Sequence, residues 1–273
     1  MLKEFSLKGK KALITGGGRG LGRAIALVFA EAGADVAVTA RTLSQCEETA
    51  ELVEKLGRRA YPLACDISDS AQVNEMAAKA MKALGQVDIL VNNAGQVTVG
   101  PLAPLPIDKP KDAIWDWGPE TGMADDVLER ILRTNVSGAL YCCRAVGPQM
   151  VKRRSGKVIN VGSSSSIIAI PYETAYGTSK AAVQMLTKIL ALEWAQFNVN
   201  VNGINPGWFV TDMTRSGFDD PKTTDERIAQ VPLKRLTGTR DLGLLALYLA
   251  SPASDWMTGQ MISLDGGETA TQF

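Results

Sequence analysis

A tyrosine and a lysine, Tyr176 and Lys180, stand four residues apart in a stretch whose apolar pattern predicts a helix over about residues 175–197. Residues at this spacing share one face of a helix, so the phenol and the ammonium would lie side by side. A nearby cation stabilises phenolate and lowers the pKa of a tyrosine from its usual value of about 10. The pair could therefore serve as an acid and base, although the spacing alone is equally typical of an exposed helix face.

The chain contains no histidine, and this narrows the chemistry open to an active site. Ser-His-Asp and Cys-His catalysis are excluded, as is every His-ligated metal site. Proton chemistry would fall to Tyr, Lys, Asp, Glu or Cys. The four cysteines lack metal-site spacing, so we expect no metal and interpret Cys46, Cys65, Cys142 and Cys143 as reduced core thiols.

A glycine-rich turn over residues 16–22 lies between a short apolar strand and a helix. Its pattern is Thr15-Gly16-x-x-x-Gly20-x-Gly22 and does not fit G-x-G-x-x-G. Residues without Cβ let backbone N–H groups and the positive end of a helix approach a pyrophosphate. Tight turns also use glycine for conformation alone, so this motif by itself is weak.

Short apolar strands alternate with helices along most of the chain. Strands are predicted at 11–15, 36–40, 60–64, 89–92, 157–161, 199–204 and 261–264, with helices after the glycine turn and at 43–56, 71–84, 127–150, 175–197 and 242–250. This alternation predicts an α/β fold, a doubly wound parallel sheet of Rossmann type with about seven strands and helices on both faces. No linker divides residues 1–273, so we expect a single domain.

One irregular region, residues 96–123, carries five prolines together with Trp115 and Trp117. It follows the carboxyl end of a strand, beside the crevice where such sheets bind ligands. We therefore expect an inserted loop near the substrate site. The alternative is an insertion that packs on the surface or touches a neighbouring subunit.

Charge and hydropathy exclude several classes of partner. The 29 Lys and Arg balance 29 Asp and Glu without a long block of one sign, so nucleic acid is not an expected partner. No apolar run has membrane length, and the N-terminus lacks the order of a signal peptide. These features predict a cytoplasmic protein that does not interact with membranes.

Taken together, the motifs resemble those of the short-chain dehydrogenase/reductases, over residues 7–267. The matching segments, in family order, are Thr15 to Gly22, Cys65-Asp66-Ile67, Asn92-Asn93-Ala94-Gly95, Thr134-Asn135-Val136, the serine run 163–166, Tyr176-x-x-x-Lys180 and Asn205-Pro206-Gly207-x-x-x-Thr211. Within the family, the chain is similar to β-ketoacyl-carrier-protein reductase-like and gluconate-5-dehydrogenase-like members.

The resemblance implies a catalytic role for four residues. Tyr176 would be the acid and base at the substrate oxygen, and Lys180 would lower its pKa and hold the nicotinamide ribose hydroxyls. Ser163 would orient the substrate oxygen, with Ser164 as the alternative serine. Asn135 would hold a water that connects Lys180 to solvent.

The preferred cofactor can be argued from charge. An NAD site usually has an acidic residue about 20 residues past the glycine turn, where it accepts from the ribose 2′-hydroxyl. Here Ala40 and Arg41 stand at that place, and Arg19 lies in the turn. Two guanidiniums could clamp a 2′-phosphate, so we predict NADP(H) in preference to NAD(H). Alternatively, either arginine is simply solvated.

Further cofactor contacts follow from the resemblance. Asp66 would accept from the adenine amine, Ile67 would pack near the ring, and Thr211 would meet the nicotinamide amide or the phosphates. The full set of expected cofactor-binding residues is Thr15, Gly16, Arg19, Gly20, Leu21, Gly22, Arg41, Asp66, Ile67, Asn93, Ala94, Gly95, Tyr176, Lys180, Pro206, Gly207 and Thr211.

The substrate pocket should draw on the segment after Gly95 and on residues 165–172 and 208–228. The side chains that favour an apolar or ring-bearing ketone there are Ile168, Ile170, Trp208, Phe209, Met213 and Phe218. We expect an oxidoreductase that transfers a hydride between NADP(H) and a ketone or secondary alcohol, most simply a carbonyl reductase of a bulky substrate.

Three alternatives stay open. A sugar-acid dehydrogenase would need a basic clamp, for which Arg215 is the nearby candidate, and a 3-oxoacyl reductase would use the same chemistry. A dinucleotide sensor without turnover is the third, and the presence of Tyr176 and Lys180 argues against it. The resemblance also implies a homotetramer that pairs the helices near 127–150 and 175–197.

Overall fold

A computed structural model describes residues 2–109 and 116–270 and has the predicted parallel sheet at its centre. The strand order is β3-β2-β1-β4-β5-β6-β7, and every neighbouring pair is parallel. The strands are β1 (Lys11–Thr15), β2 (Asp35–Ala40), β3 (Ala60–Ala64), β4 (Ile89–Asn92), β5 (Gly156–Val161), β6 (Val199–Pro206) and β7 (Met261–Leu264). The order reverses between β1 and β4, which is where a doubly wound sheet opens a crevice at its carboxyl edge. The predicted fold class is confirmed.

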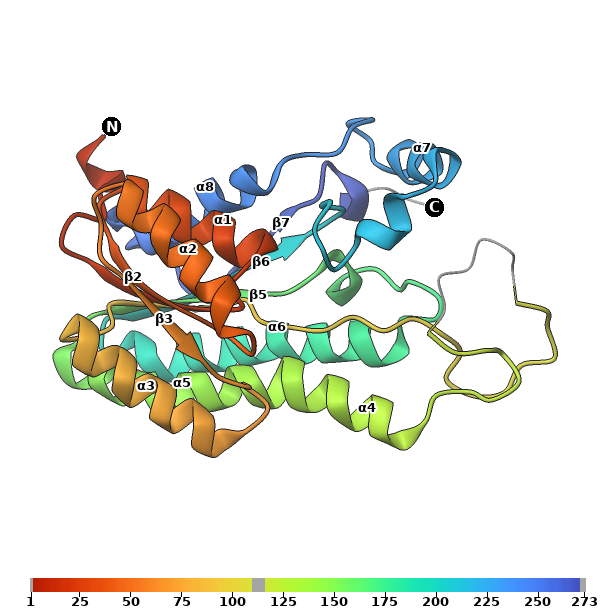
Figure 1. Ribbon diagram of the computed structural model, residues 1–273, viewed down its shortest axis with the longest axis horizontal. Coiled ribbons are helices and arrows are strands. Elements are labelled where there is room, and N and C mark those ends of the chain that lie inside the picture. The colour runs from red at the N-terminus through yellow and green to blue at the C-terminus, as the bar shows by residue number, and fades with distance from the viewer. Residues whose placement is uncertain (1, 110–115, 271–273) are drawn as a thin grey trace.

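Helices cover both faces of the sheet (Figure 1). One face carries α1 (Gly20–Glu31), α2 (Leu43–Lys55) and α8 (Thr239–Ala250), and the other carries α3 (Ser70–Leu84), α5 (Gly138–Arg153) and α6 (Thr174–Ala195). Neighbouring residues of β1 point to opposite faces, so Leu13 and Ile14 enter two separate buried apolar clusters. Because both faces are covered, a central strand such as β4 is almost continuously apolar, although β6 carries three asparagines.

The helix predicted over 127–150 is interrupted in the structure. It consists of α4 (Asp125–Leu132), a π-helical segment at Arg133–Ser137 and then α5. A π turn adds a residue to one helical turn and is found mostly at functional sites. Asn135 lies inside this segment. The apolar spacing of the sequence gave no sign of it, because the helix resumes on the same axis after one turn.

Two other elements differ from the prediction. Strand β6 continues to Pro206 rather than ending at 204, because Asn205 and Pro206 pair with β7. The helix α7 (Pro221–Gln230) was not predicted. Its N-cap residue is Asp220, whose carboxylate accepts from the backbone N–H of Thr223 at 2.9 Å.

The described flanks of the loop 96–123 protrude beyond α4 and the N-terminal end of α6 (Figure 1). Residues 110–115, which include Pro110 and Trp115, lie outside the described part of the chain. The two flanks of the loop run beside each other, and the indole of Trp117 donates to the carbonyl of Pro101 at 2.8 Å. The backbone N–H of Gly100 donates to the carbonyl of Tyr172 at 2.9 Å. The loop is thus attached to the segment that follows β5.

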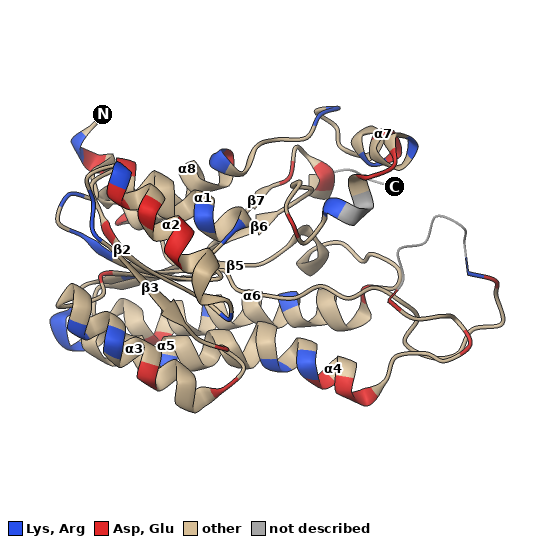
Figure 2. Cartoon of the chain, viewed as in Figure 1, with Lys and Arg blue, Asp and Glu red and all other residues tan. Residues whose placement is uncertain are grey.

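Charges of both signs lie along the outer faces of α2, α3 and α4 (Figure 2). The four cysteines are free and buried. Across residues 2–109 and 116–270, no helix combines the length and the apolar character needed to cross a membrane. The same ranges contain no group of His, Cys, Asp and Glu that could hold a metal ion.

Candidate active site

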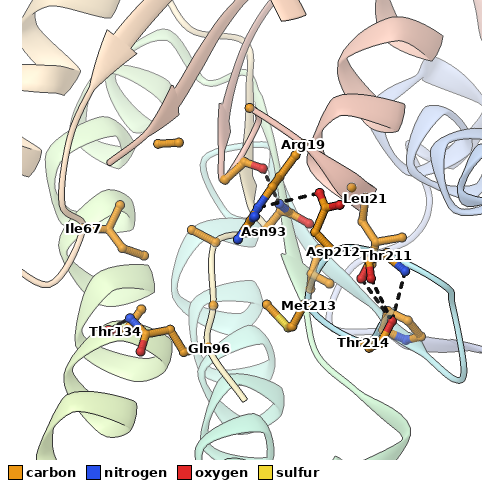
Figure 3. A pocket seen from close by; sticks show the side chains of 18 of the residues that line it. Arg19, Leu21, Ile67, Asn93, Gln96, Thr134, Thr211, Asp212, Met213 and Thr214 are labelled. Atoms are coloured by element: carbon orange, nitrogen blue, oxygen red, sulfur yellow. Dashed lines mark hydrogen bonds and ion pairs between the residues drawn. The ribbon is translucent and has the colours of Figure 1, made fainter. Parts of the chain in front are cut away.

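A cleft opens at the carboxyl ends of the central strands, where the sequence predicted it (Figure 3). The predicted residues that line it are Gly16, Arg19, Gly20, Leu21, Arg41, Asp66, Ile67, Asn93, Ala94, Gly95, Ser163, Tyr176, Lys180, Pro206, Gly207 and Thr211. Lining residues that were not predicted are Gly18, Thr39, Thr42, Gln45, Cys65, Gln96, Thr134, Val161, Gly162, Asp212 and Thr214. Nearly all of these are sequence neighbours of predicted residues, so proximity to a motif was the only available signal.

The glycine turn shapes one wall of the cleft. Gly16 and Gly20 have φ of 64° and 54°, a backbone conformation that favours glycine. A Cβ on Gly16 would lie 2.8 Å from Nδ2 of Asn93. The turn leads into α1, where the N-cap residue Arg19 does not cap with its side chain. The first N–H groups of α1 therefore remain available to an anion, as a pyrophosphate requires.

Two predicted cofactor residues, Thr15 and Gly22, support the turn from behind and do not line the cleft. The hydroxyl of Thr15 accepts from the N–H groups of Asn93 and Ala94, both at 3.1 Å. The amide of Asn93 donates to the carbonyls of Thr15 at 2.9 Å and Gly16 at 3.2 Å. A Cβ on Gly22 would collide with the carbonyl oxygen of Gly16. These buried contacts join the glycine turn to the end of β4.

At the end of β2 the cleft is positively charged. Ala40 occupies the place of the acidic residue of an NAD site, and Arg41 is exposed without a hydrogen bond or ion pair among the described residues. The Arg19 side chain is 55% exposed, and its Nε lies 3.9 Å from a carboxylate oxygen of Asp212. At this distance and exposure the ion pair is weak. Both guanidiniums can therefore reorient toward a phosphate.

Asp66 and Ile67 follow β3 and continue the cofactor wall next to the end of β2. One carboxylate oxygen of Asp66 accepts from the backbone N–H and hydroxyl of Ser68, at 2.9 and 2.7 Å. Its other oxygen makes no hydrogen bond within the described residues. The side chain of Ile67 packs against Gly138, the first residue of α5. A nicotinamide dinucleotide fits this wall. The wall offers the N–H groups at the start of α1, two arginines, and a carboxylate beside an apolar side chain.

Tyr176, Lys180 and Ser163 meet at the centre of the cleft. Tyr176 and Lys180 project from the first two turns of α6, and Nζ of Lys180 lies 5.7 Å from the centre of the Tyr176 ring. That ammonium donates to the carbonyl of Val161 at 2.9 Å. The hydroxyl of Ser163 forms a hydrogen bond with Tyr176.

Burial dominates the protonation of this pair. It raises the pKa of Tyr176 to about 12, an effect to which Glu173 adds and which the hydrogen bond with Ser163 opposes. It lowers the pKa of Lys180 to about 8. The expected fall in the pKa of Tyr176 is therefore not found in the protein alone, because Lys180 is directed toward Val161 and desolvation is the larger effect. The phenol keeps its proton and is suited to act as an acid.

The serine run has a different partner for each hydroxyl. Of these four described serines, Ser163 alone lines the cleft. The side chain of Ser164 hydrogen-bonds to Glu268, and Ser165 donates to Glu173 at 2.6 Å. Ser166 donates to the carbonyl of Ser163 at 2.6 Å. The geometry therefore favours Ser163 over the alternative, Ser164, as the residue that meets a substrate oxygen.

Asn135 lies next to the cleft without lining it. Its amide donates to the carbonyl of Gln96 at 2.8 Å and to Oγ of Ser179 at 2.9 Å, while its oxygen accepts from the N–H of Gln96 at 2.8 Å. A Cβ on Gly95 would lie 3.2 Å from Oδ1 of Asn135 and 3.3 Å from Nζ of Lys180. Asn135 thus clamps the chain after β4 beside Lys180. Its water-holding role stays a prediction.

The substrate side contains an arginine that sequence reasoning missed. The guanidinium carbon of Arg227 lies 4.7 Å from the ring centre of Trp208 and 4.9 Å from that of Phe218. These two rings meet edge to face at 6.0 Å. The predicted clamp, Arg215, is instead exposed and 3.9 Å from Asp212. Of the predicted substrate contacts, the buried Phe209 and the exposed Met213 line the cleft, whereas Ile168, Ile170, Trp208 and Phe218 do not.

The chain is similar in sequence to known proteins along nearly its whole length. A family model described as Enoyl-(Acyl carrier protein) reductase matches residues 16–269. The 7alpha-hydroxysteroid dehydrogenase of Escherichia coli K12 is 34% identical, covering 97% of this chain and 96% of its own. The 3-oxoacyl-[acyl-carrier-protein] reductase FabG of Staphylococcus epidermidis is 36% identical, covering 94% and 98%.

A similar solved structure is that of a gluconate 5-dehydrogenase from Burkholderia cenocepacia J2315 in complex with NADP and tartrate. It superimposes with a TM-score of 0.88 at 34% identity and covers 99% of each chain. The likeness thus extends over the whole sheet and both helical layers.

Proposed function

Because the chain belongs to the short-chain dehydrogenase/reductase family, and is thus an oxidoreductase acting on a CH–OH or C=O group, we propose that it is an NADP(H)-dependent carbonyl reductase of bulky, rather apolar ketones. The observation that carries the proposal is the convergence of Tyr176, Lys180 and Ser163 beside the glycine turn in one cleft. A non-enzymatic sensor would have no use for this arrangement.

The protein's own groups handle the proton and the orientation of the substrate. Tyr176 holds its proton at Oη and is placed to give it to a carbonyl oxygen, or to receive it from a hydroxyl in reverse. Ser163 hydrogen-bonds to the same oxygen, and Lys180 holds the nicotinamide ribose. Asn135 contributes by holding a water next to Lys180. A bound nicotinamide would supply or accept the hydride, and its oxidised ring adds a positive charge that favours phenolate.

The nicotinamide dinucleotide is expected to be NADP(H). Arg41 is exposed at the end of β2, Ala40 replaces an acidic residue, and Arg19 lies across the same corner of the cleft. A 2′-phosphate would gain charge-assisted hydrogen bonds here, whereas NAD(H) would find no carboxylate for its 2′-hydroxyl. Structural relatives with bound NADP support this choice.

An apolar substrate is supported by Trp208, Phe218 and the side chains of Ile168 and Ile170, which all follow the carboxyl ends of β5 and β6. The loop 96–123, attached at Tyr172, is proposed as the outer wall of this pocket. A sugar-acid dehydrogenase is the second candidate, because the guanidinium between the two rings could pair with a substrate carboxylate, and a 3-oxoacyl reductase is the third.

The test is an assay of NADPH oxidation by the purified protein with three ketone classes: cyclic apolar ketones, keto sugar acids and 3-oxoacyl thioesters. We expect the highest kcat/KM for the cyclic ketones. A preference for the sugar acids or the thioesters would replace the substrate class and keep the reaction. No turnover in either direction with any class, despite cofactor binding, would contradict the enzymatic proposal.

We also propose a homotetramer in a reducing, cytoplasmic compartment. Leu140 on α5 and Met185, Ile189 and Leu192 on α6 are exposed apolar side chains on the two helices that would pair. The four buried free thiols are typical of a reducing compartment. Light scattering checks the assembly, and a monomeric mass would contradict it.

A further inference from the structure

A chain of side-chain hydrogen bonds leads from the centre of the cleft to a carboxylate that the proposed reaction does not use. Ser163, which bonds to Tyr176, contacts Oγ of Ser165 at 3.2 Å. Ser165 in turn donates to Oε2 of Glu173 at 2.6 Å. Glu173 stands immediately before α6, three residues ahead of Tyr176. The last group of the chain is therefore a carboxylate on the same helix end as the catalytic phenol.

The ionisation of Glu173 determines which way the hydroxyl protons point. An ionised carboxylate can only accept, so the single proton of Ser165 is directed to Glu173. Oγ of Ser165 then accepts the proton of Ser163, which leaves Ser163 with lone pairs toward the cleft. One of these also accepts the backbone N–H of Ser165 at 3.2 Å. In this state Ser163 can receive the hydroxyl proton of Tyr176 but cannot donate to a carbonyl oxygen.

A proton on Glu173 removes this constraint. The protonated carboxyl can donate to Ser165, whose own proton can then be directed to Ser163, and the hydroxyl of Ser163 is released toward the cleft. Donation to the oxygen where negative charge develops is the type of contact that accelerates a reduction by about 10²–10³-fold. The position of one proton outside the cleft thereby changes the hydrogen bonding inside it.

We propose that Glu173 is a positioning residue whose protonation turns the hydroxyl of Ser163 toward the substrate carbonyl. The inference rests on the proposed carbonyl reduction for its kinetic consequence. Ketone reduction should therefore become more efficient as the pH falls through the titration of this carboxyl.

The groups around Glu173 affect the pH at which its carboxyl titrates. Burial raises its pKa from the ordinary value for a glutamate. The charged and titratable groups that face it are Tyr176 on its own helix, Arg227 of α7, which opposes the rise, and Glu268 near the C-terminus. The guanidinium of Arg227 packs on the rings of Trp208 and Phe218. Its position relative to Glu173 would therefore set the pH at which the hydrogen bonds from Ser163 to Glu173 reverse their direction.

The kinetic test compares kcat/KM for ketone reduction at about pH 5.5 and about pH 8 in the wild type, Glu173→Gln and Ser165→Ala. In the wild type we expect a ratio of about tenfold in favour of the lower pH. Both variants should reduce this ratio to within about twofold, because Glu173→Gln removes the carboxylate and Ser165→Ala breaks the hydrogen-bond chain that leads to it. Ser165→Ala should also raise kcat/KM at about pH 8, because Ser163 loses the acceptor that holds its proton.

Ser166→Ala is the matched control. Its hydroxyl bonds to the carbonyl of Ser163, to Gln184 and to Asn205 and is not part of the chain to Glu173, so the wild-type ratio should remain. The proposal is overturned if Glu173→Gln and Ser165→Ala keep the wild-type ratio. It is equally overturned if Glu173→Gln lowers kcat/KM by the same factor at both pH values, as a purely structural role would.

A spectroscopic titration separates this inference from the proposed function. Ionised Glu173 opposes formation of the phenolate, so Glu173→Gln should lower the apparent pKa of Tyr176 whether or not the protein turns over a ketone. The Tyr176 signal is the difference in phenolate absorbance between each protein and its Tyr176→Phe counterpart. An unchanged Tyr176 titration would contradict the link to Glu173, whereas a shifted titration without turnover would contradict only the reductase.

Discussion

The two walls of the cleft are held in different ways. On the cofactor wall, partly buried hydrogen bonds from Asn93 to Thr15 join the glycine turn to the end of β4. On the substrate wall, the loop 96–123 meets the segment after β5 through the bond from Gly100 to Tyr172, and Arg227 of α7 packs on the rings of Trp208 and Phe218.

This difference separates the part of the cleft that close backbone packing fixes from the part that can change at little cost. Relatives of similar identity are named for a hydroxysteroid, a 3-oxoacyl carrier protein and gluconate. A wall made of backbone contacts around glycines admits few alternatives, whereas exposed loops accept insertions at little cost. Substitutions on the cofactor wall should therefore have large effects, and those on the substrate wall should change selectivity.

The largest effect is expected at the residue where the two walls meet. Tyr176→Phe removes the proton donor but keeps the ring and its packing, so kcat should fall by about 10²–10⁴-fold while the Kd for NADPH stays within about twofold. Steady-state kinetics and calorimetric titration measure the two quantities. Equal loss of binding and turnover would show that the side chain is structural.

A methyl group on the cofactor wall should be nearly as damaging. In Gly22→Ala the new Cβ would meet the carbonyl oxygen of Gly16, so the turn must shift. Overpacking of this kind costs about 1–3 kcal/mol, and we expect weaker NADPH binding together with a lower Tm. Gly57→Ala is a control for the replacement of a glycine by alanine as such. A Cβ there meets no atom within 4 Å, although its φ of 75° carries some strain. Normal cofactor binding by Gly22→Ala would refute the supporting role of this glycine.

Charge at the edge of the cofactor wall should set the choice of cofactor. Arg41→Ala removes a guanidinium from the 2′-phosphate corner, and a charge-assisted hydrogen bond is worth about 1.5–3 kcal/mol. We expect about a tenfold or greater loss of NADPH affinity with NADH affinity unchanged. Parallel titrations with NADPH and NADH give the result directly. If the wild type binds NADH as well as NADPH, the charge argument for the cofactor is wrong.

Burial of the Lys180 ammonium should lower the stability of the folded protein. The folded pKa of Lys180, about 8, lies below its ordinary value of 10.5, so the unfolded chain binds more protons between these values. The cost of burying the charge is complete below about pH 8 and decreases as the pH rises toward 10.5.

We therefore expect Lys180→Met to raise the free energy of unfolding by about 1–3 kcal/mol at pH 7, with a smaller gain at about pH 9.5. Denaturant unfolding at the two pH values measures this. A gain that does not change with pH would exclude the titration of Lys180 as its source.

The smallest effect is expected on the outer substrate wall. Trp117→Ala removes a bond to Pro101 and the ring that covers Gly100, both within the protruding loop. The KM for the ketone should rise a few-fold, with no change in NADPH affinity and a change in Tm that is small for a surface position. If NADPH affinity falls instead, the loop acts on the cofactor wall and the separation of the two walls does not hold.

The motifs allowed much of the fold and site to be predicted. Residues of the glycine turn and the pair Tyr176 and Lys180 follow from local spacing, because neighbours along a turn or a helix face are neighbours in space. The parallel, doubly wound class of sheet also follows, since strands that alternate with helices are joined by right-handed crossovers. The π segment at Asn135 could not be predicted, because one added residue in a turn leaves the apolar pattern of the helix almost unchanged.

The sequence by itself therefore determined the sheet, the position of the cleft and the residues that can carry a proton. Only the tertiary structure decided the protonation and the hydrogen-bond partners of these residues. It placed Arg227 between Trp208 and Phe218, directed Lys180 toward Val161 and connected Ser163 to Glu173 through Ser165. The physical reason is that burial and hydrogen-bond direction depend on groups that are far apart in sequence and come together only when the chain folds.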